Sequence, residues 1–190
     1  MLDDIENEFL ENILPDKQRP RKKKNSKVKG NTGERELVKI LTERFPNKIF
    51  TRTMGSGNYT GGKNAYHANI LDESQKLLFV ADIRTPKEFK FSIEHKFYNS
   101  IDFYDLFNKS SNLFSWYTQS ATDAKLLKKQ PLLVVKTNRH KRIAFLPLEV
   151  LLNEPSLKDS VVFIHNNHAC MWLEDLLKAP DSFFFDESVK

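Results

Sequence analysis

The stretch KLLFVADIRTPKEFKFSIEHKFY, residues 76–98, decides the fold. It contains two apolar runs, KLLFVADI and FKFSIEHKFY, separated by a short polar segment that includes Pro86. Runs rich in aromatic and β-branched residues on either side of a proline are typical of paired strands. The stretch therefore predicts a β-hairpin with Pro86 in its turn.

Strand alternation in this hairpin predicts a cluster of charged side chains. Successive side chains point to opposite faces of a strand, so Glu94 and Lys96 should project together from the second run. Asp82 comes near the end of the first run, where the hairpin would bring it close to Glu94. Two carboxylates can hold Mg²⁺, which activates water and neutralises a phosphate, and a nearby lysine stabilises the developing charge.

The spacing of Glu94 and Lys96 is weak evidence for a catalytic site when taken alone. Glu-x-Lys should occur by chance about once in a chain of ordinary composition. A second copy, Glu88-Phe89-Lys90, lies beside the predicted turn, so we favour the copy inside the strand. The alternative for the strand copy is an ion pair on a solvated face.

An upstream helix supplies a further carboxylate. The sequence GNTGERELVKILTERF, residues 30–45, places apolar residues at helical spacing and predicts a helix over 32–45 with Thr32 as its N-cap. Glu34 would then lie in the first turn, where the helix dipole favours a negative charge. The alternative is a routine capping acid.

The remaining apolar patterns predict an α/β domain. A short strand is expected at 48–53, and one or two helices at 102–128. Two further strands are expected at 131–137 and 142–148, followed by a strand and a closing helix within 161–177. The resulting order, α-β-β-β-α-β-β, is typical of helices packed around a central mixed sheet.

Composition limits the class of protein. A chain of 190 residues, 39% hydrophobic and 29% charged, suits one compact domain with tails. The single cysteine, Cys170, excludes an internal disulfide framework and a cysteine-rich zinc site. No apolar run approaches the roughly 20 residues of a membrane span, and the acidic N-terminus is unlike a secretory signal. We therefore expect a cytoplasmic protein without a membrane partner, and the net charge of +5 favours a polyanionic one.

The patterns divide the chain into three regions. Residues 1–29 contain an acidic amphipathic segment at 3–14 and a basic arm at 17–29, which we expect to be flexible. Residues 30–150 form the domain that carries the charged cluster, and residues 151–190 form a C-terminal extension packed on it. The basic arm is either a solvated linker or a contact for phosphates.

Five motifs in order resemble those of the archaeal-type Holliday-junction resolvases, within the PD-(D/E)xK nuclease superfamily. They are KGNTGERELVKIL at 29–41, FTRTMGS at 50–56, VADI at 80–83, SIEHK at 92–96 and PLLVVK at 131–136. The resemblance implies a restriction-endonuclease-like core with a five-stranded sheet flanked by helices. It also implies a homodimer that nicks opposite strands of a four-way DNA junction with Mg²⁺, or with Mn²⁺ in its place.

The resemblance assigns roles to the matching residues. Glu34, Asp82 and Glu94 would be the catalytic carboxylates at the metal, with Asp82 and Glu94 as direct ligands, and Lys96 would be the catalytic lysine. The DNA-binding residues would be Lys29, Arg35, Arg52, Ser56 and Lys136.

The sequence departs from the family pattern at two places, and the first of them concerns specificity. Residues 57–81 intervene before Asp82 as an insertion rich in glycine, aromatic and basic residues. Such a loop suits stacking on bases and contact with phosphates, or it is a tolerated surface elaboration. The position before the aspartate, often proline in the family, is Ala81.

Other candidate residues fit a structural role better. The spacing of His165, His168 and Cys170 matches no usual structural zinc site. His95 alternates to the face opposite the charged cluster, which favours a core histidine, and helix phase alone leaves the orientation of Gln119 open. The sequence contains no P-loop, Ser-His-Asp order or dinucleotide fingerprint.

These observations predict a metal-dependent endonuclease that prefers branched DNA such as a Holliday junction. A same-fold nuclease with another target, restriction-like or duplex-specific, is the first alternative. The others are a non-catalytic DNA-binding protein on a nuclease-like scaffold and an interaction module that uses the N-terminal segment.

Overall fold

The computed structural model describes residues 26–53, 72–108 and 111–189. The predicted amphipathic segment, most of the basic arm, Ser56 and the glycine-rich part of the insertion lie outside the described residues.

A seven-stranded sheet, ordered β1-β2-β3-β4-β5-β7-β6, organises the described chain. β3 and β4 run parallel, and the other neighbouring pairs are antiparallel. The sheet is therefore mixed, as predicted. Its strands are β1 (Thr51–Arg52), β2 (Ile83–Arg84), β3 (Phe91–Tyr98), β4 (Gln130–Thr137), β5 (Arg142–Pro147), β6 (Phe163–His165) and β7 (His168–Trp172).

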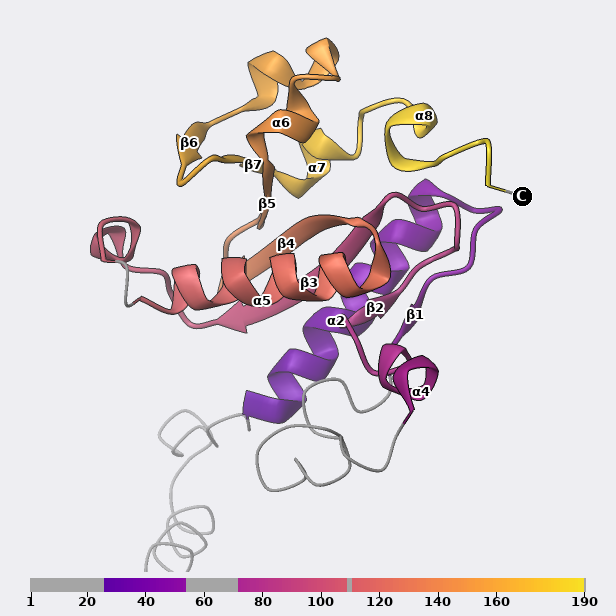
Figure 1. The fold of residues 1–190 in the computed structure, drawn as a ribbon. Helices are drawn as coiled ribbons and strands as arrows, with labels where there is room; N and C mark the ends of the chain where they lie inside the picture. The colour runs from indigo at the N-terminus through magenta and orange to yellow at the C-terminus, as the bar shows by residue number, and fades with distance from the viewer. Residues whose placement is uncertain (1–25, 54–71, 109–110, 190) are drawn as a thin grey trace, which may run out of the picture.

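Helices cover both faces of this sheet (Figure 1). α2 (Ser26–Arg44) packs on one face of β3, and α5 (Asn112–Leu127) packs on the other face over β3 and β4. This arrangement confirms the predicted α/β fold class. The shorter helices are α4 (Glu73–Leu77), η2 (Phe103–Leu106), α6 (Leu148–Leu151), η3 (Pro155–Ser160), α7 (Leu173–Leu176) and α8 (Asp181–Phe184). Within the described ranges, no helix combines the length and apolarity needed to cross a bilayer.

β4 supplies side chains to the core on both sides of the sheet. Leu132 and Val134 pack in the cluster that includes Leu37 of α2, whereas Leu133 and Val135 pack against α5. All four strand residues are at most 2% exposed. A strand buried on both faces reads as a continuous apolar run, which is why PLLVV stood out in the sequence.

α2 begins earlier than predicted. It starts at Ser26, so the last residues assigned to the basic arm form its first turn, and that turn contains no acidic residue. Thr32 is not an N-cap, because its hydroxyl donates to the Val28 carbonyl one turn back at 2.8 Å. Glu34 therefore lies well inside the helix, and the dipole argument for it was wrong. Lysines favour the helix and carry it past Gly30, which costs only about 1 kcal/mol.

The predicted hairpin exists, but its first strand is far shorter than the run KLLFVADI. Only Ile83–Arg84 forms β2, and Ile83 pairs with Ile93 of β3. The beginning of the run instead belongs to α4. There the Asp72 side chain accepts a hydrogen bond from the Gln75 N–H, and the Gln75 side chain accepts one from the Asp72 N–H. This capping box starts a helix where apolar content alone suggested a strand.

The C-terminal third also differs from its prediction. A hairpin, β6 and β7, replaces the single expected strand, and it extends the sheet beyond the five strands that the resemblance implied. Asn166 and Asn167 form its turn with φ of 47° and 59°. Two consecutive residues at positive φ are typical of two-residue hairpin turns, and asparagine tolerates this conformation. The closing helix α7 has only four residues.

The chain end is part of the core on the α2 side. Phe184 is fully buried, with its ring centroid 5.1 Å from that of Phe45 and 6.0 Å from that of Phe91. Its carbonyl accepts a hydrogen bond from the Lys90 N–H at 2.8 Å. Residues after α7 therefore support the start of β3.

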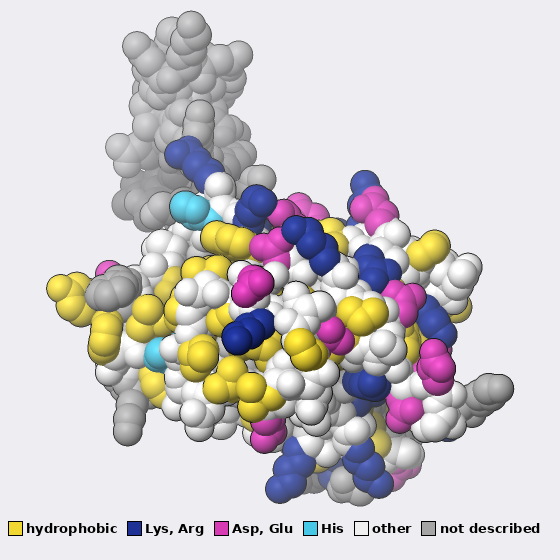
Figure 2. Space-filling model, turned by 90° about the horizontal axis from the view of Figure 1, so that it is seen from above, with side chains coloured by type: hydrophobic (Ala, Val, Ile, Leu, Met, Phe, Trp, Pro, Cys, Tyr) yellow, Lys and Arg dark blue, Asp and Glu magenta, His cyan; other side chains and the backbone are white. Residues whose placement is uncertain are grey.

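Over the C-terminal elements the surface mixes basic and acidic side chains (Figure 2).

We expect Phe184→Ala to lower the free energy of unfolding by about 3–5 kcal/mol, because it leaves a cavity among packed rings. Urea denaturation followed by circular dichroism measures the change. Leu152→Ala is the control, since Leu152 is 73% exposed and its truncation should cost less than about 0.5 kcal/mol. Similar curves for the two variants would contradict a core role for the chain end.

Candidate active site

β3 presents two charged side chains towards α5. Lys96 Nζ lies 2.6 Å from Glu94 Oε1 and donates a hydrogen bond to Gln119 Oε1 at 2.9 Å. The Glu94 side chain is only 2% exposed, and that of Lys96 is 20% exposed. Alternation along the strand thus brings the two charges together, and Gln119 of α5 faces them.

Glu94 is buried with few polar contacts. Apart from the Lys96 ammonium 2.6 Å from Oε1, its carboxylate has no hydrogen-bond partner among the described residues. Burial, and then the charge of Asp82, raise the pKa of Glu94 to about 8, although Lys96 lowers it. Lys96 offsets only part of the cost of burial, so a proton or a bound metal ion would stabilise the carboxylate further.

Asp82 is fixed between β1 and β3. Its Oδ2 accepts a hydrogen bond from the His95 N–H at 2.9 Å. Its own N–H donates to the Ile93 carbonyl at 3.2 Å, and its carbonyl accepts from the Thr53 N–H at 2.9 Å. These bonds hold its carboxylate beside the centre of β3.

The residue before Asp82 adopts an unusual backbone conformation. Ala81 has φ of 61° and is 3% exposed. This left-handed conformation is unfavourable for a residue with a side chain, and a proline, whose φ is near −65°, cannot adopt it. The departure from the family's proline at this position therefore has a structural reason.

Asp123 of α5 is an acidic neighbour that the sequence analysis missed. Its carboxylate accepts a hydrogen bond from the Ala81 N–H, and its charge acts on Glu94. Burial, followed by the charge of Asp82, raises its pKa, whereas the bond from Ala81 lowers it. The available signal was its spacing: Asp123 follows Gln119 by four residues, so both lie on one face of α5.

Glu34 reaches the site from α2. Its Oε2 lies 2.5 Å from Arg52 Nε, and Arg52 also donates to Asn31 Oδ1 at 2.9 Å. Burial raises the pKa of Glu34, the hydrogen bond from Arg52 lowers it, and the charge of Asp82 raises it further. The structure therefore brings Glu34 and Arg52 together as an ion pair next to the carboxylates.

α2 approaches β3 closely because Gly33 has no side chain. A Cβ atom there would lie 2.4 Å from His95 Cε1 and 3.0 Å from Phe97 Cδ1. His95 is 4% exposed, as the core interpretation predicted. Burial and the charge of Arg142 lower its pKa to about 3, so the ring is neutral. This contact sets the position of Glu34, the next residue along α2.

Comparison with known proteins places this geometry in a family. Residues 25–171 match the family described as "Phage putative PDDEXK endonuclease". The chain belongs to this PDDEXK endonuclease family. The predicted PD-(D/E)xK superfamily is thereby confirmed, and the protein is a nuclease.

One solved structure with partial likeness is that of Hjc from Archaeoglobus fulgidus, a Holliday junction resolvase from an archaeal hyperthermophile. The identity is 12%, the alignment covers 79% of this chain and 93% of that chain, and the TM-score is 0.36. No curated protein matches the chain. The archaeal-type resolvase activity therefore stays a prediction for this PDDEXK endonuclease.

The DNA-binding residues predicted for the endonuclease are spread over several elements. Arg35 is exposed and has no hydrogen bond or ion pair with the described residues. Lys29 donates to Asn99 Oδ1 at 2.6 Å and lies 4.5 Å from the centroid of the Phe97 ring. Lys136 projects to the α2 side of the sheet, away from the carboxylates, and donates to the His140 carbonyl.

The two carboxylates of the endonuclease fit a hard cation. In the described part of the chain, no three acidic, histidine or cysteine side chains meet as a metal-binding group. Mg²⁺, however, is usually held by one or two carboxylates, with water and substrate phosphate as its other ligands. The buried Glu94 carboxylate, which has few polar contacts, and the oriented carboxylate of Asp82 suit that role. A metal-binding role for Glu34, which Arg52 holds, stays a prediction.

The histidines near the C-terminus serve packing. The Tyr117 ring stacks on His168 with centroids 4.3 Å apart, and its hydroxyl lies 3.3 Å from His165 Nδ1. Cys170 is buried beside them, and burial raises its pKa to about 12.

The two glycines of α2 provide a matched pair of tests. Gly30→Ala should raise the free energy of unfolding by about 0.5–1 kcal/mol, since its Cβ meets nothing within 4 Å and alanine favours the helix. Gly33→Ala should instead lower it by about 1–3 kcal/mol, because the Cβ overlaps His95. Urea denaturation of both variants checks this. Equal effects would show that α2 does not need the close approach.

The raised pKa of Glu94 predicts a pH-dependent stability in the presence of a chelator. The folded protein binds this proton more tightly than the unfolded chain, so the stabilisation is complete below about pH 4.5 and is lost as the pH rises through about 8. Glu94→Gln removes this loss. The difference in free energy of unfolding between Glu94→Gln and wild type should therefore widen from about pH 5 to pH 9. It should grow by up to about 1.4 kcal/mol for each pH unit between the pKa values of Glu94 in the folded and the unfolded state.

Urea denaturation at several pH values measures this gap. Parallel stability curves for wild type and Glu94→Gln would contradict the raised pKa that burial gives to the carboxylate.

Proposed function

We propose that this PDDEXK endonuclease is a Mg²⁺-dependent deoxyribonuclease that cuts branched DNA, with a Holliday junction as its preferred substrate. The observation that carries the proposal is the buried Glu94 carboxylate, which lies next to Asp82 and has only Lys96 as a hydrogen-bonding or ion-pair partner among the described residues. A fold has little structural use for such a group, but a phosphodiesterase needs it to bind a cation.

Asp82 and Glu94 would hold the cation, for which Mn²⁺ can substitute. When bound there, the cation neutralises charge on the scissile phosphate and lowers the pKa of water. Glu94 would be ionised when it holds the cation, whereas without one its pKa of about 8 favours the protonated form near neutral pH.

Lys96 supplies the positive charge on the protein side. Its ammonium group has both Glu94 of β3 and Gln119 of α5 as partners, and these two contacts fix its orientation. It can stabilise negative charge on the reacting phosphate or orient the attacking water. Gln119 acts as a positioning residue through Lys96.

Two further groups support the phosphate side of the site. Arg52 stands at the edge of the carboxylates and is held by Glu34 and Asn31, which orients its guanidinium. Arg35 is exposed on α2 one residue after Glu34. Both are suited to contacting phosphates on either side of the cleaved bond.

Branched DNA as the target rests on the ordered motifs shared with the resolvases. Paired cuts in a four-way junction require two active sites related by a two-fold axis, so we propose a homodimer. The insertion before Asp82 offers glycine, aromatic and basic residues for an unpaired or bent region of the substrate.

Cleavage assays with matched variants test the proposal. The second Glu-x-Lys copy is the control, because Glu88 pairs with Lys48 at 2.6 Å and Lys90 donates to the Ser182 carbonyl, away from the site. We expect Lys96→Met and Glu94→Gln to lower the Mg²⁺-dependent nicking rate about 10²-fold or more. Lys90→Met and Glu88→Gln should leave it near wild type.

The substrates are labelled four-way junction, flap, single-stranded and linear duplex DNA. Paired nicks in the junction support a resolvase. Cleavage of linear duplex alone would keep the catalytic centre and reject the branched target. Tight junction binding without cleavage under any divalent cation would identify a non-catalytic DNA-binding protein.

A further inference from the structure

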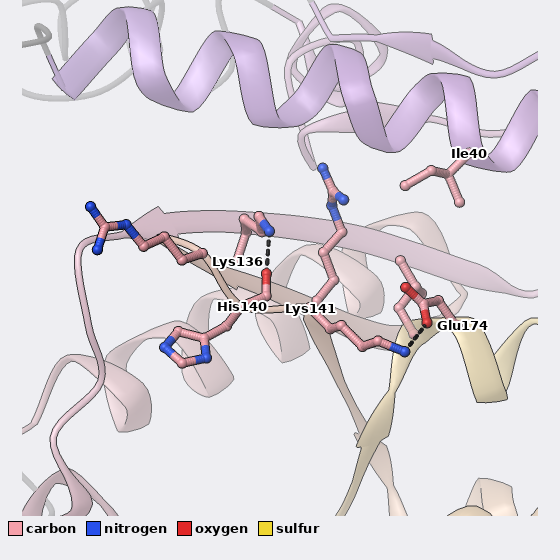
Figure 3. A pocket seen from close by; sticks show the side chains of 8 residues that line it. Ile40, Lys136, His140, Lys141 and Glu174 are labelled. Carbon is pink, nitrogen blue, oxygen red and sulfur yellow. Dashed lines mark hydrogen bonds and ion pairs between the residues drawn. The ribbon is translucent and has the colours of Figure 1, made fainter.

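Residues 136–142, KTNRHKR, connect β4 to β5, and we call them the basic hairpin. They border a hollow of about 500 Å³ between the sheet and α2, which Ile40 and Leu173 also line. Figure 3 shows Ile40 on the helix side of this hollow and the basic side chains on the strand side. Four basic side chains of the hairpin line this open hollow, which suits an anionic ligand.

Positive charge in the basic hairpin exceeds its local compensation. Arg142 Nη2 lies 2.5 Å from Glu36 Oε2, and Lys141 Nζ lies 2.6 Å from Glu174 Oε2 (Figure 3).

The other two cations have no acidic partner in the described part of the chain. Lys136 donates to the backbone carbonyl of His140, and Arg139 is exposed without a hydrogen bond or ion pair to any described residue. Two positive charges at the rim of the hollow are therefore free to meet an anion.

Arg139 occupies a backbone position that normally favours glycine. Its φ is 64°, in a turn where the His140 N–H bonds to the Thr137 carbonyl at 3.4 Å. Glycine or asparagine is preferred at such a position, and another residue costs about 1–2 kcal/mol. The arginine side chain forms no hydrogen bond or ion pair with a described residue that would offset this cost. Its presence is explained better by a ligand than by the fold.

The basic hairpin lies beside the catalytic strand. Phe97, the residue after Lys96, pairs with Lys136 across β3 and β4. Asn99 Oδ1 accepts hydrogen bonds from Lys29 Nζ at 2.6 Å and from Asn138 Nδ2 at 3.2 Å. A continuous strip of basic and amide groups therefore runs from the beginning of α2 to the hairpin, at the end of the sheet next to Lys96.

We infer that the basic hairpin binds backbone phosphates of the DNA duplex that leads away from the cleaved bond. This inference rests on the proposed nuclease function and adds a second contact area to it. Arg139 and Lys136 provide the phosphate contacts, whereas Lys141 and Arg142 are already paired with Glu174 and Glu36. Because these groups read charge and not base edges, the contact is independent of sequence.

Arg139→Gly separates binding from folding. Glycine suits the turn, so the variant should be at least as stable as wild type while it loses the guanidinium. Lys128→Gly is a matched control, because Lys128 has φ of 54° at the C-terminus of α5 and its exposed side chain has no partner among the described residues. It removes the same charge at the opposite end of β4, roughly 25 Å away.

The measurement is fluorescence anisotropy with labelled duplex and four-way junction DNA, in EDTA, from about 50 to 300 mM NaCl. Loss of one phosphate contact reduces the slope of log affinity against log salt by about 1. We expect this reduction for Arg139→Gly, no change for Lys128→Gly, and a wild-type slope for Arg139→Lys.

An unchanged slope for Arg139→Gly would overturn the inference. If Arg139→Gly keeps the wild-type DNA slope but loses binding to poly-glutamate, the inference is also overturned. The hairpin would then be assigned to an acidic protein partner. Mg²⁺-dependent nicking by the wild type is measured in parallel. Nicking with an unchanged Arg139→Gly slope rejects the hairpin alone, whereas a wild type that neither binds nor cuts DNA rejects the proposed function itself.

Discussion

β3 has to be covered on both faces and still carry a charged pair, and this constraint organises the molecule. β2 and β4 pair with its edges, α2 packs on one face and α5 on the other. Water is therefore excluded from Glu94, and its charge depends on neighbours that the fold delivers. Lys96 comes from the same strand, Asp82 from the adjacent connection, and Gln119 from α5.

The two helices set the geometry of this pair from opposite sides. On the α2 side, a neutral and buried His95 packs where Gly33 leaves space, and the helix can then deliver Glu34 to the edge of the site. On the α5 side, Gln119 and Asp123 lie one turn apart, so one positions Lys96 and the other holds the backbone before Asp82. The site therefore depends on helix packing as much as on its strand.

Charge is distributed unevenly around this scaffold. Ion pairs compensate Arg52, Lys141 and Arg142, while Arg35 and Arg139 stay without partners among the described residues. An exposed cation without a partner costs the fold little and keeps its full attraction for a phosphate. The net charge of +5 thus says less about DNA binding than the positions of the few uncompensated groups do.

The sequence by itself determined the strands that are buried on both faces, the pairing of Glu94 with Lys96, and the nuclease superfamily, because alternation and ordered motifs are local properties. It failed at the start of α2 and in the run before Asp82, where helix propensity and a capping box competed with the apolar pattern. Only the tertiary structure revealed Asp123, the left-handed Ala81 and the ion pair of Glu34. These features depend on contacts between residues far apart in sequence, which no local spacing encodes.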